Sequence, residues 1–244
     1  MRNLAIDIGN SRIKTGVFEN ETLVEVQHWS RPEEMKIAEW ITNQKWENVI
    51  YSTVAEPLPT AVSAVIPEEL KLLELTASTP LPIQNRYGTP ETLGKDRLAA
   101  VLGAFSQFPN TNCLVIDSGT CVTYDLLTAS GDYLGGNISP GWEMRLDAMA
   151  HFTARLPRPE SQILMDWIGN TTENALQNGA FYGLIAEMEG LIQRASSQFG
   201  TINVILTGGN AQNFAKILKS KIFVNQNLVL EGLNKILIYN VASS

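Results

Sequence analysis

Residues that build structural metal sites are scarce in this chain. Its 244 residues include two cysteines and two histidines, too few soft ligands for a structural zinc ion. Cys113 and Cys121 also lack the spacing of zinc-binding pairs. We expect both to be buried thiols in neighbouring strands.

Long apolar stretches are missing too. No run reaches the roughly 20 residues that a membrane-spanning helix needs. The opening Met1–Asp7 passes directly into a strand-like pattern, without the hydrophobic region of a signal peptide. The sequence therefore predicts a cytoplasmic protein without a membrane partner.

An excess of positive charge is absent as well. The chain has 18 Lys and Arg against 25 Asp and Glu, a formal charge of −7. Nucleic acids and anionic membranes favour a basic face, so neither is expected as a partner, and an anionic ligand must be held by local donors. With 44% hydrophobic and 18% charged residues, the composition is that of a globular protein with one large or two small cores.

Apolar and β-branched patterns predict three strands joined by tight turns at the start of the chain, followed by alternating helices and strands. The expected strands are 3–9, 12–18, 22–29, 48–54 and 71–76, and the expected helices are 32–45, 59–70 and 98–108.

The pattern restarts near residue 112. Ile6–Asn10 matches Ile116–Thr120, each at a turn between two apolar strands. This predicts a duplicated α/β domain, residues 1–111 and 112–244, with the two turns facing one another across a nucleotide cleft. In the second domain we expect strands 121–127, 133–138 and 203–206, helices 142–151, 171–197 and 228–239, and an irregular loop over 152–170.

Both repeated turns contain Asp-x-Gly. The glycine permits a tight turn or a close approach to a ligand. Backbone N–H groups and the Asn10, Ser11 and Thr120 side chains supply donors for phosphate, and Asp7 and Asp117 can hold hydrated Mg²⁺. One such turn is ordinary, but two at matching places favour a phosphate site.

Two further features fit a nucleotide. Lys14 lies four residues beyond Asn10 and could neutralise a terminal phosphate. Thr207–Asn210, with the sequence Thr-Gly-Gly-Asn, follows an apolar strand, and its glycines would let backbone approach a flat group such as adenine. Gly-Gly after a strand is more often a plain strand-to-helix connection, so this segment alone decides nothing.

The loop Tyr87–Arg97 runs into the expected helix 98–108 and places Asp96 and Arg97 at its start. In one interpretation Asp96 caps the helix by accepting N–H bonds. In the other, the same carboxylate is a general base beside a substrate hydroxyl, and Arg97 offers a planar fork for a carboxylate.

These segments resemble the type III pantothenate kinases, members of the actin and sugar kinase superfamily, over essentially the whole chain. Asp7–Lys14 resembles the family's first phosphate motif, Asp117–Thr123 its second, and Gly94–Arg97 its Gly-x-Asp-Arg motif. Gly135–Gly141 and Thr172–Gly179 resemble two further segments of the family. The resemblance implies duplicated actin-like (ribonuclease H-like) domains and ATP-dependent phosphorylation of pantothenate in coenzyme A biosynthesis.

The resemblance also implies a site. Asp96 would be the proton acceptor, Mg²⁺ would accompany ATP, and a monovalent cation, K⁺ or NH₄⁺, would bind at Asp117. The family is dimeric, with each pocket completed across the subunit interface. Ser11 stands where Thr is common and Cys121 where Ala is common, and neither change removes a catalytic group. The implied pantothenate contacts are Tyr87, Gly94, Lys95, Asp96, Arg97 and Thr172, and the implied nucleotide contacts are Asp7, Ile8, Gly9, Asn10, Ser11, Arg12, Ile13, Lys14 and Thr120.

Two other functions stay open. Two phosphate turns specify ATP and not its acceptor, so another kinase of the superfamily, such as a sugar or acetate kinase, is one alternative. A nucleotide-binding regulator that has lost catalysis is the other, although the intact Asp7, Asp96 and Asp117 favour an enzyme.

The expected helix 171–197 has an apolar stripe broader than one core-facing side requires. It predicts either a homodimer interface or a fully buried helix. The stripe consists of Ala175, Leu176, Ala180, Phe181, Leu184, Ile185, Met188 and Leu191.

Overall fold

The computed structural model describes residues 1–10, 12–54 and 57–242. None of the helices in these ranges is both long and apolar enough to cross a membrane. The chain divides into two compact units. Their boundaries differ from those of the expected domains 1–111 and 112–244, because the C-terminal segment belongs to the first unit. The first unit contains residues 1–110, 127–135 and the described residues from 227 onward, and the second contains 111–126 and 136–226.

A five-stranded sheet forms the centre of the first unit. The expected strands at the start of the chain are confirmed, with ends that differ by one or two residues. The strand order β3-β2-β1-β4-β5 combines antiparallel β1–β2 and β2–β3 pairs with parallel β1–β4 and β4–β5 pairs. The strands are β1 (Arg2–Ile8), β2 (Arg12–Glu19), β3 (Thr22–Ser30), β4 (Asn48–Thr53) and β5 (Lys71–Glu74).

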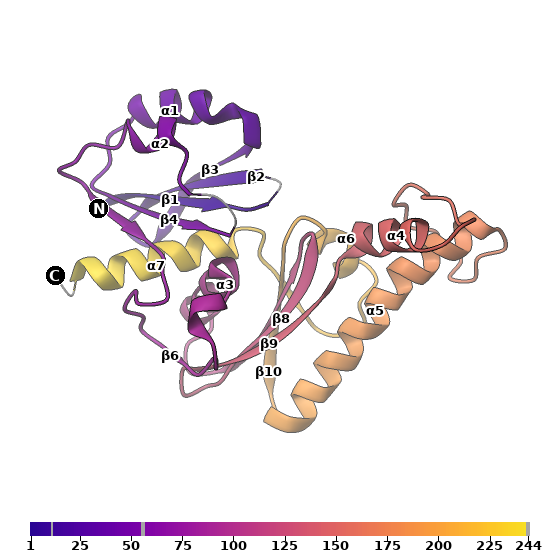
Figure 1. Cartoon of the computed structure of the whole chain (residues 1–244). Helices are drawn as coiled ribbons and strands as arrows, with labels where there is room; N and C mark the ends of the chain where they lie inside the picture. Colours follow the sequence, from indigo (N-terminus) through magenta and orange to yellow (C-terminus); the bar gives the residue numbers. More distant parts are fainter. Residues whose placement is uncertain (11, 55–56, 243–244) are drawn as a thin grey trace. The chain divides into compact units, whose positions relative to one another are not determined.

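Helices cover this sheet. Figure 1 shows α1 (Glu34–Thr42) and α2 (Thr60–Ser63) on one face and α7 (Leu228–Ala242) on the other, where α7 packs against α3 (Lys95–Gln107). The expected helix over 59–70 is correct only at its beginning. Pro67 lacks the N–H for an i→i−4 bond and disfavours helical backbone at Ile66, so turns replace the rest. Short 3₁₀ turns lie at Arg31–Glu33 and Pro90–Thr92.

The C-terminal helix α7 is an apolar element buried in the first unit. Leu230, Leu233 and Leu237 have no exposed surface. On its polar side Asn234 accepts a hydrogen bond from Asn3 Nδ2 (2.9 Å), and Asn48 Nδ2 donates to Asn3 Oδ1 (3.1 Å). This chain of buried amides connects α7 to β1 and β4.

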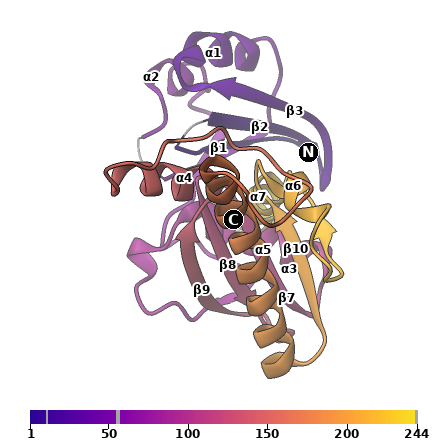
Figure 2. The same ribbon diagram turned by 90° about the vertical axis from the view of Figure 1, so that its right-hand side faces the viewer.

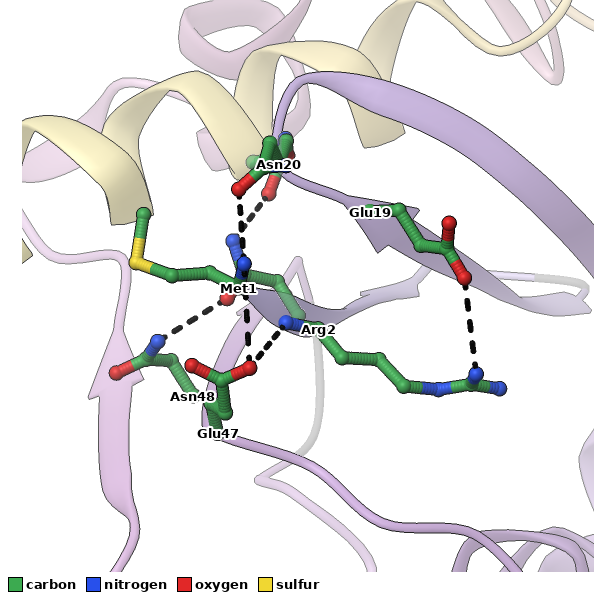
Figure 3. Close-up of polar contacts among 8 residues, drawn as sticks. Met1, Arg2, Glu19, Asn20, Glu47 and Asn48 are labelled. Atoms are coloured by element: carbon green, nitrogen blue, oxygen red, sulfur yellow. Dashed lines mark hydrogen bonds and ion pairs between the residues drawn. The ribbon is translucent and has the colours of Figure 1, made fainter.

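Polar contacts also fix the start of β1 (Figure 3). The α-amino group of Met1 donates to Asn20 Oδ1 (2.8 Å) and lies 3.9 Å from Glu47 Oε1. The backbone N–H of Arg2 donates to the same carboxylate (2.9 Å), and its guanidinium lies 3.9 Å from Glu19. These contacts hold the register of the strand whose other end carries Asp7.

The second sheet has the order β11-β10-β7-β8-β9-β6. Most of it belongs to the second unit, while β6 and the start of β9 belong to the first. The expected strands 121–127, 133–138 and 203–206 are confirmed, and the short β6 and β11 were not predicted. The strands are β6 (Gln84–Asn85), β7 (Asn112–Ser118), β8 (Cys121–Leu127), β9 (Asp132–Pro140), β10 (Ile202–Thr207) and β11 (Phe223–Val224).

Helix α5 (Thr172–Phe199) lies along this sheet in the second unit (Figure 2), with α4 (Trp142–His151) and α6 (Ala211–Ala215) beside it. As predicted, residues 152–170 contain no helix or strand. Most of the apolar stripe of α5 lies in the core of its own unit, where Phe181, Leu184 and Met188 are at most 1% exposed. The width of the stripe is therefore explained without a second subunit.

Of the two cysteines, Cys113 is buried in β7, as expected, and Cys121 at the start of β8 is partly exposed. Trp142 is 4% exposed and packs on Phe181 and Phe214, so it belongs to the core.

Candidate active site

The first turn joins β1 to β2. The N–H of Gly9 donates to Arg12 O (3.0 Å), and Asp7 is paired with Lys14 across the hairpin. Asn10 in the turn and Arg12 at the start of β2 are exposed, while Ile13 is buried. The hairpin thus presents backbone and polar side chains at the end of two core strands. Ser11 lies outside the described residues.

Asp7 is partly exposed at the end of β1 and accepts a hydrogen bond from Ser52 Oγ of β4 (3.1 Å). Its pKa is raised from an ordinary value of 3.8 to about 6, chiefly by loss of hydration and next by the negative charge of Asp96. Lys14 and the Ser52 hydroxyl act in the opposite direction. The fold therefore brings two carboxylates, Asp7 and Asp96, into one electrostatic environment.

Asp96 lies in the first turn of α3. Its Oδ1 accepts the backbone N–H of Arg97 (2.8 Å), but the capping residue is Gly94 rather than Asp96. A Cβ at Gly94 would lie 2.6 Å from Asp96 Oδ1. Glycine at this position therefore leaves room for the carboxylate of Asp96 beside the start of the helix.

Tyr87 and Arg97, expected in one pocket, are in contact. The Arg97 guanidinium lies over the Tyr87 ring, 5.5 Å from its centroid, and Arg97 is 5% exposed. A guanidinium over an aromatic face is stabilised by the ring quadrupole. Lys95 begins the same helix and is partly exposed.

The second turn joins β7 to β8 and repeats the first. Residues 1–10 and 111–120 have the same sequence of exposed, partly exposed and buried positions, so that Asp117 corresponds to Asp7 and Thr120 to Asn10. The N–H of Gly119 donates to Cys121 O (2.9 Å), two residues further along, whereas Gly9 donates to Arg12, three residues further along. The correspondence inferred from the sequence therefore extends to burial, while the second turn is one residue shorter.

Two glycine-containing segments pack against this second turn. Gly141 donates its N–H to Thr120 O (3.1 Å), and a Cβ on Gly141 would lie 2.6 Å from Gly119 O. From the Thr-Gly-Gly-Asn loop, Asn210 donates its N–H to Ser118 O (3.1 Å). The two segments therefore hold the turn from both sides within the second unit.

The second unit also contains a polar cluster that the sequence did not reveal. Arg145 donates to Pro140 O (3.0 Å) and Ser139 Oγ (2.9 Å) and forms an ion pair with Glu187 of α5. Tyr124 OH donates to the same carboxylate (2.7 Å). Burial tends to raise the pKa of Glu187, but hydrogen bonds from Tyr124, Ser139 and Arg145 outweigh it and lower that pKa.

Thr172, at the first position of α5, is exposed and directly follows the cap Thr171, whose side chain accepts the N–H of Asn174 (3.2 Å). The predicted residues are therefore divided between the two units: Asp7 and Asp96 belong to the first, and Asp117, Thr120 and Thr172 belong to the second.

The donor set suits hard cations. Among the described side chains, no three or more of His, Cys, Asp and Glu group closely enough to hold a metal by themselves. The carboxylates of Asp7 and Asp96 offer oxygen ligands, and Mg²⁺ commonly takes one or two carboxylates while water and phosphate oxygens fill its other positions.

Comparison with known proteins places these groups in a family. The model of the type III pantothenate kinase family matches residues 3–194. The type III pantothenate kinases of Christiangramia forsetii and Bacteroides fragilis are each 41% identical to this chain, over 241 and 238 residues, with 98% of both chains covered. The one from Porphyromonas gingivalis is 39% identical over 242 residues, covering 98% of this chain and 99% of its own.

Solved structures share the fold at lower identity. A Campylobacter jejuni protein described as a candidate transcriptional activator of the Baf family aligns with a TM-score of 0.63 at 22% identity, covering 98% of this chain and 99% of that one. A candidate N-acetylmannosamine kinase from Listeria monocytogenes aligns with a TM-score of 0.59 at 13% identity, covering 99% and 100%. These similarities confirm the predicted α/β fold.

Proposed function

From the premise that this chain belongs to the type III pantothenate kinase family, we propose how its residues perform the family's reaction. That reaction is the ATP-dependent phosphorylation of pantothenate in coenzyme A biosynthesis. The observation that carries the assignment of roles is that the negative charge of Asp96 contributes to the raised pKa of Asp7, because a phosphoryl-transfer site needs both a cation-binding carboxylate and a proton acceptor.

Asp96 is the general base. Its carboxylate accepts the proton of the primary hydroxyl of pantothenate as that oxygen attacks the γ-phosphorus of ATP, and ADP leaves. The space left by Gly94 and the position in the first turn of α3 support this role. A positioned base typically contributes about 10²–10⁴-fold in rate.

Residues of the first turn bind the phosphates. The backbone from Asp7 to Lys14 and the side chains of Asn10 and Lys14 donate to phosphate oxygens. Asp7 holds Mg²⁺ near the phosphates. When bound, this ion neutralises charge that develops during phosphoryl transfer.

Arg97 binds the carboxylate of pantothenate through its planar fork, and Tyr87, Gly94 and Lys95 line the same pocket. Support comes from the contact between Tyr87 and Arg97 and from the low exposure of Arg97.

A monovalent cation, K⁺ or NH₄⁺, binds at Asp117. The proposal is supported by the partial exposure of Asp117, which occupies the position in the second turn that Asp7 occupies in the first. Replacing K⁺ with Na⁺ at constant ionic strength is expected to depress turnover. Equal rates in both salts would remove this site from the proposal.

The active form is a homodimer in which Thr172 contacts pantothenate in the neighbouring subunit. The apolar stripe of α5 gives no support, but the loop before that helix exposes large apolar side chains. Met165 is 99% exposed, Trp167 70% and Ile168 65%, and side chains of α5 hold the loop backbone through Asn178 Nδ2 to Asp166 O (2.8 Å). Fixed, exposed apolar groups favour a subunit contact.

Mixing inactive Asp96→Asn subunits with inactive Thr172→Tyr subunits tests shared pockets. Heterodimers are expected to regain activity because one of their two pockets is intact. Absence of rescue, despite subunit exchange measured with differently tagged chains, would place both residues in one subunit's pocket.

The whole assignment is tested by incubating purified protein with ATP, Mg²⁺, K⁺ and pantothenate. We expect phosphopantothenate by mass spectrometry and no product with sugars or acetate as acceptors. Product with a sugar alone would favour a different kinase of the superfamily, and nucleotide binding without product from any acceptor would favour a regulator.

A further inference from the structure

The aromatic ring of Tyr87 contacts three residues of the first unit. It stacks on Tyr133, with ring centroids 6.3 Å apart and planes at 8°, and carries the Arg97 guanidinium on its face. It also lies against the backbone of Gly135. We propose that Gly135 is a positioning residue for the pantothenate pocket, because the missing side chain leaves the space in which Tyr87 holds Arg97.

The contact between Gly135 and Tyr87 leaves no room for a side chain. A Cβ on Gly135 would lie 2.8 Å from Cδ2 and 3.1 Å from Cε2 of the Tyr87 ring. Real Cβ atoms essentially never approach other atoms as closely as the first of these distances, so the ring would have to move. Gly135 also has φ of +94°, a backbone conformation that favours glycine.

The backbone of Tyr87 has little freedom to retreat from such a clash. Its N–H donates to Asn85 Oδ1 (3.0 Å), and the preceding N–H, of Arg86, donates to Tyr133 O (2.9 Å). Strand β6 pairs with the start of β9 at Asn85 and Tyr133. With the backbone fixed to β9 on the side of Gly135, an added methyl group displaces the ring itself.

Displacement of the Tyr87 ring would weaken substrate binding by moving the Arg97 guanidinium. The guanidinium is at the end of a flexible chain, and the face of Tyr87 favours one of its positions. A planar fork binds a carboxylate well only when both donors are aligned. This step rests on the proposed function, in which Arg97 binds the carboxylate of pantothenate.

The chain offers a matched control for backbone strain. Gly131 has a similar φ of +81°, and a Cβ there meets only Phe105 Cε2 at 3.8 Å, an ordinary contact. Gly131→Ala therefore introduces comparable strain near the same strand without touching Tyr87. The difference in kcat/KM for pantothenate between Gly135→Ala and Gly131→Ala isolates the effect of displacing the Tyr87 ring.

Steady-state kinetics of both variants test the inference. We expect Gly135→Ala to lower kcat/KM for pantothenate by about 10- to 100-fold, since a misplacement of about 1 Å can have an effect of this size. The KM for ATP should stay within about twofold of the wild-type value, and Gly131→Ala should change neither parameter by more than about twofold. Equal losses in the two glycine variants would overturn the inference.

A double variant separates this inference from the proposed function. If Gly135 acts through Tyr87, adding Gly135→Ala to Tyr87→Ala lowers kcat/KM no further than Tyr87→Ala alone, and additive losses would reject the positioning role. If Tyr87→Ala leaves kcat/KM for pantothenate unchanged, the assignment of the pocket fails instead.

A second variant at the same position distinguishes the proposed displacement of Tyr87 from misfolding. Gly135→Asn keeps the clashing Cβ but tolerates a left-handed backbone better than Ala, so it should show the same loss for pantothenate. If circular dichroism shows that Gly131→Ala folds while neither Gly135 variant does, the glycine is required for folding and the positioning role is rejected.

Discussion

Neutralising Asp7 is expected to stabilise the protein while it abolishes catalysis. Asp7→Asn keeps the shape of the side chain, and its Oδ1 can still accept the Ser52 hydroxyl bond seen at 3.1 Å. What the change removes is a negative charge that is poorly hydrated and lies in the field of Asp96. Sites that bind cations commonly store destabilisation of this kind.

The magnitude follows from the raised pKa. One pKa unit corresponds to 1.36 kcal/mol, so the rise from 3.8 to about 6 amounts to about 3 kcal/mol of unfavourable free energy when Asp7 is ionised. Because Asp7 is partly exposed, solvent screening reduces this figure, and we expect a gain of about 1–3 kcal/mol in the free energy of unfolding for Asp7→Asn.

The sign depends on pH. An acid whose pKa is higher in the folded state is destabilising once it ionises there, so its penalty is absent below pH 3.8, grows through about pH 6 and is complete above. The free energy of unfolding of Asp7→Asn should therefore exceed that of the wild type most at pH 8, and this difference should shrink as pH falls toward 4.

Urea unfolding followed by circular dichroism, in EDTA and without nucleotide, measures this difference. Asp132→Asn is a control of opposite sign, because Ser130 and Arg86 lower the pKa of Asp132 and its replacement should not stabilise. If Asp7→Asn is no more stable than wild type at pH 8, Asp7 is not held in an unfavourable environment, and the argument that burial and the charge of Asp96 raise its pKa fails.

Three further outcomes are expected. Asp96→Asn should lower kcat by about 10²–10⁴-fold while calorimetry finds ATP affinity nearly unchanged; near-normal turnover would remove Asp96 from the base role. Asn3→Ala removes the hydrogen-bond partner of Asn48 Nδ2 and of Asn234 Oδ1, while Asn234 Nδ2 keeps its bond to Asn20 O, and should cost about 1–3 kcal/mol in urea unfolding per unsatisfied polar atom; an unchanged midpoint would contradict this. Because hydrogen bonds lower the pKa of Glu187, it stabilises the fold above its ordinary pKa, and this contribution disappears as pH falls through the lowered value. Glu187→Gln should therefore lower the free energy of unfolding at pH 7 but change it little in strong acid. An equal loss at both pH values would contradict a lowered pKa of Glu187 in the folded protein.

The parts of the fold that could be predicted are those set by local pattern. The two Asp-x-Gly turns follow apolar strands, and their surroundings agree down to the exposure of each residue in 1–10 and 111–120. Helix α4 and the start of α5 were also predicted within a residue. Apolar periodicity and turn chemistry act over a few residues and can be read from them directly.

The predictions that were wrong or incomplete concern contacts between residues far apart in the sequence. Helix α7 was expected in the second domain because it follows that domain in sequence, yet its leucines and Asn234 pack with the first unit. Ser52 was overlooked for the same reason, since its bond to Asp7 arises from the pairing of β1 with β4. The width of the α5 stripe was measured correctly but allowed two explanations, and the core of the second unit accounts for most of it.

The return of α7 to the first unit has a consequence for the site. Its packing on α3 requires glycine on both helices, because a Cβ on Gly103 would lie 2.9 Å from a side-chain carbon of Leu228, and one on Gly232 would lie 2.8 Å from the N of Gly103. Helix α3 carries Asp96 at its start, and the amides of α7 and β1 are bonded through Asn234 and Asn3. Helix α7 therefore contacts both α3, which carries Asp96, and β1, which carries Asp7. The spacing of the two carboxylates thus depends on a helix that contains neither of them.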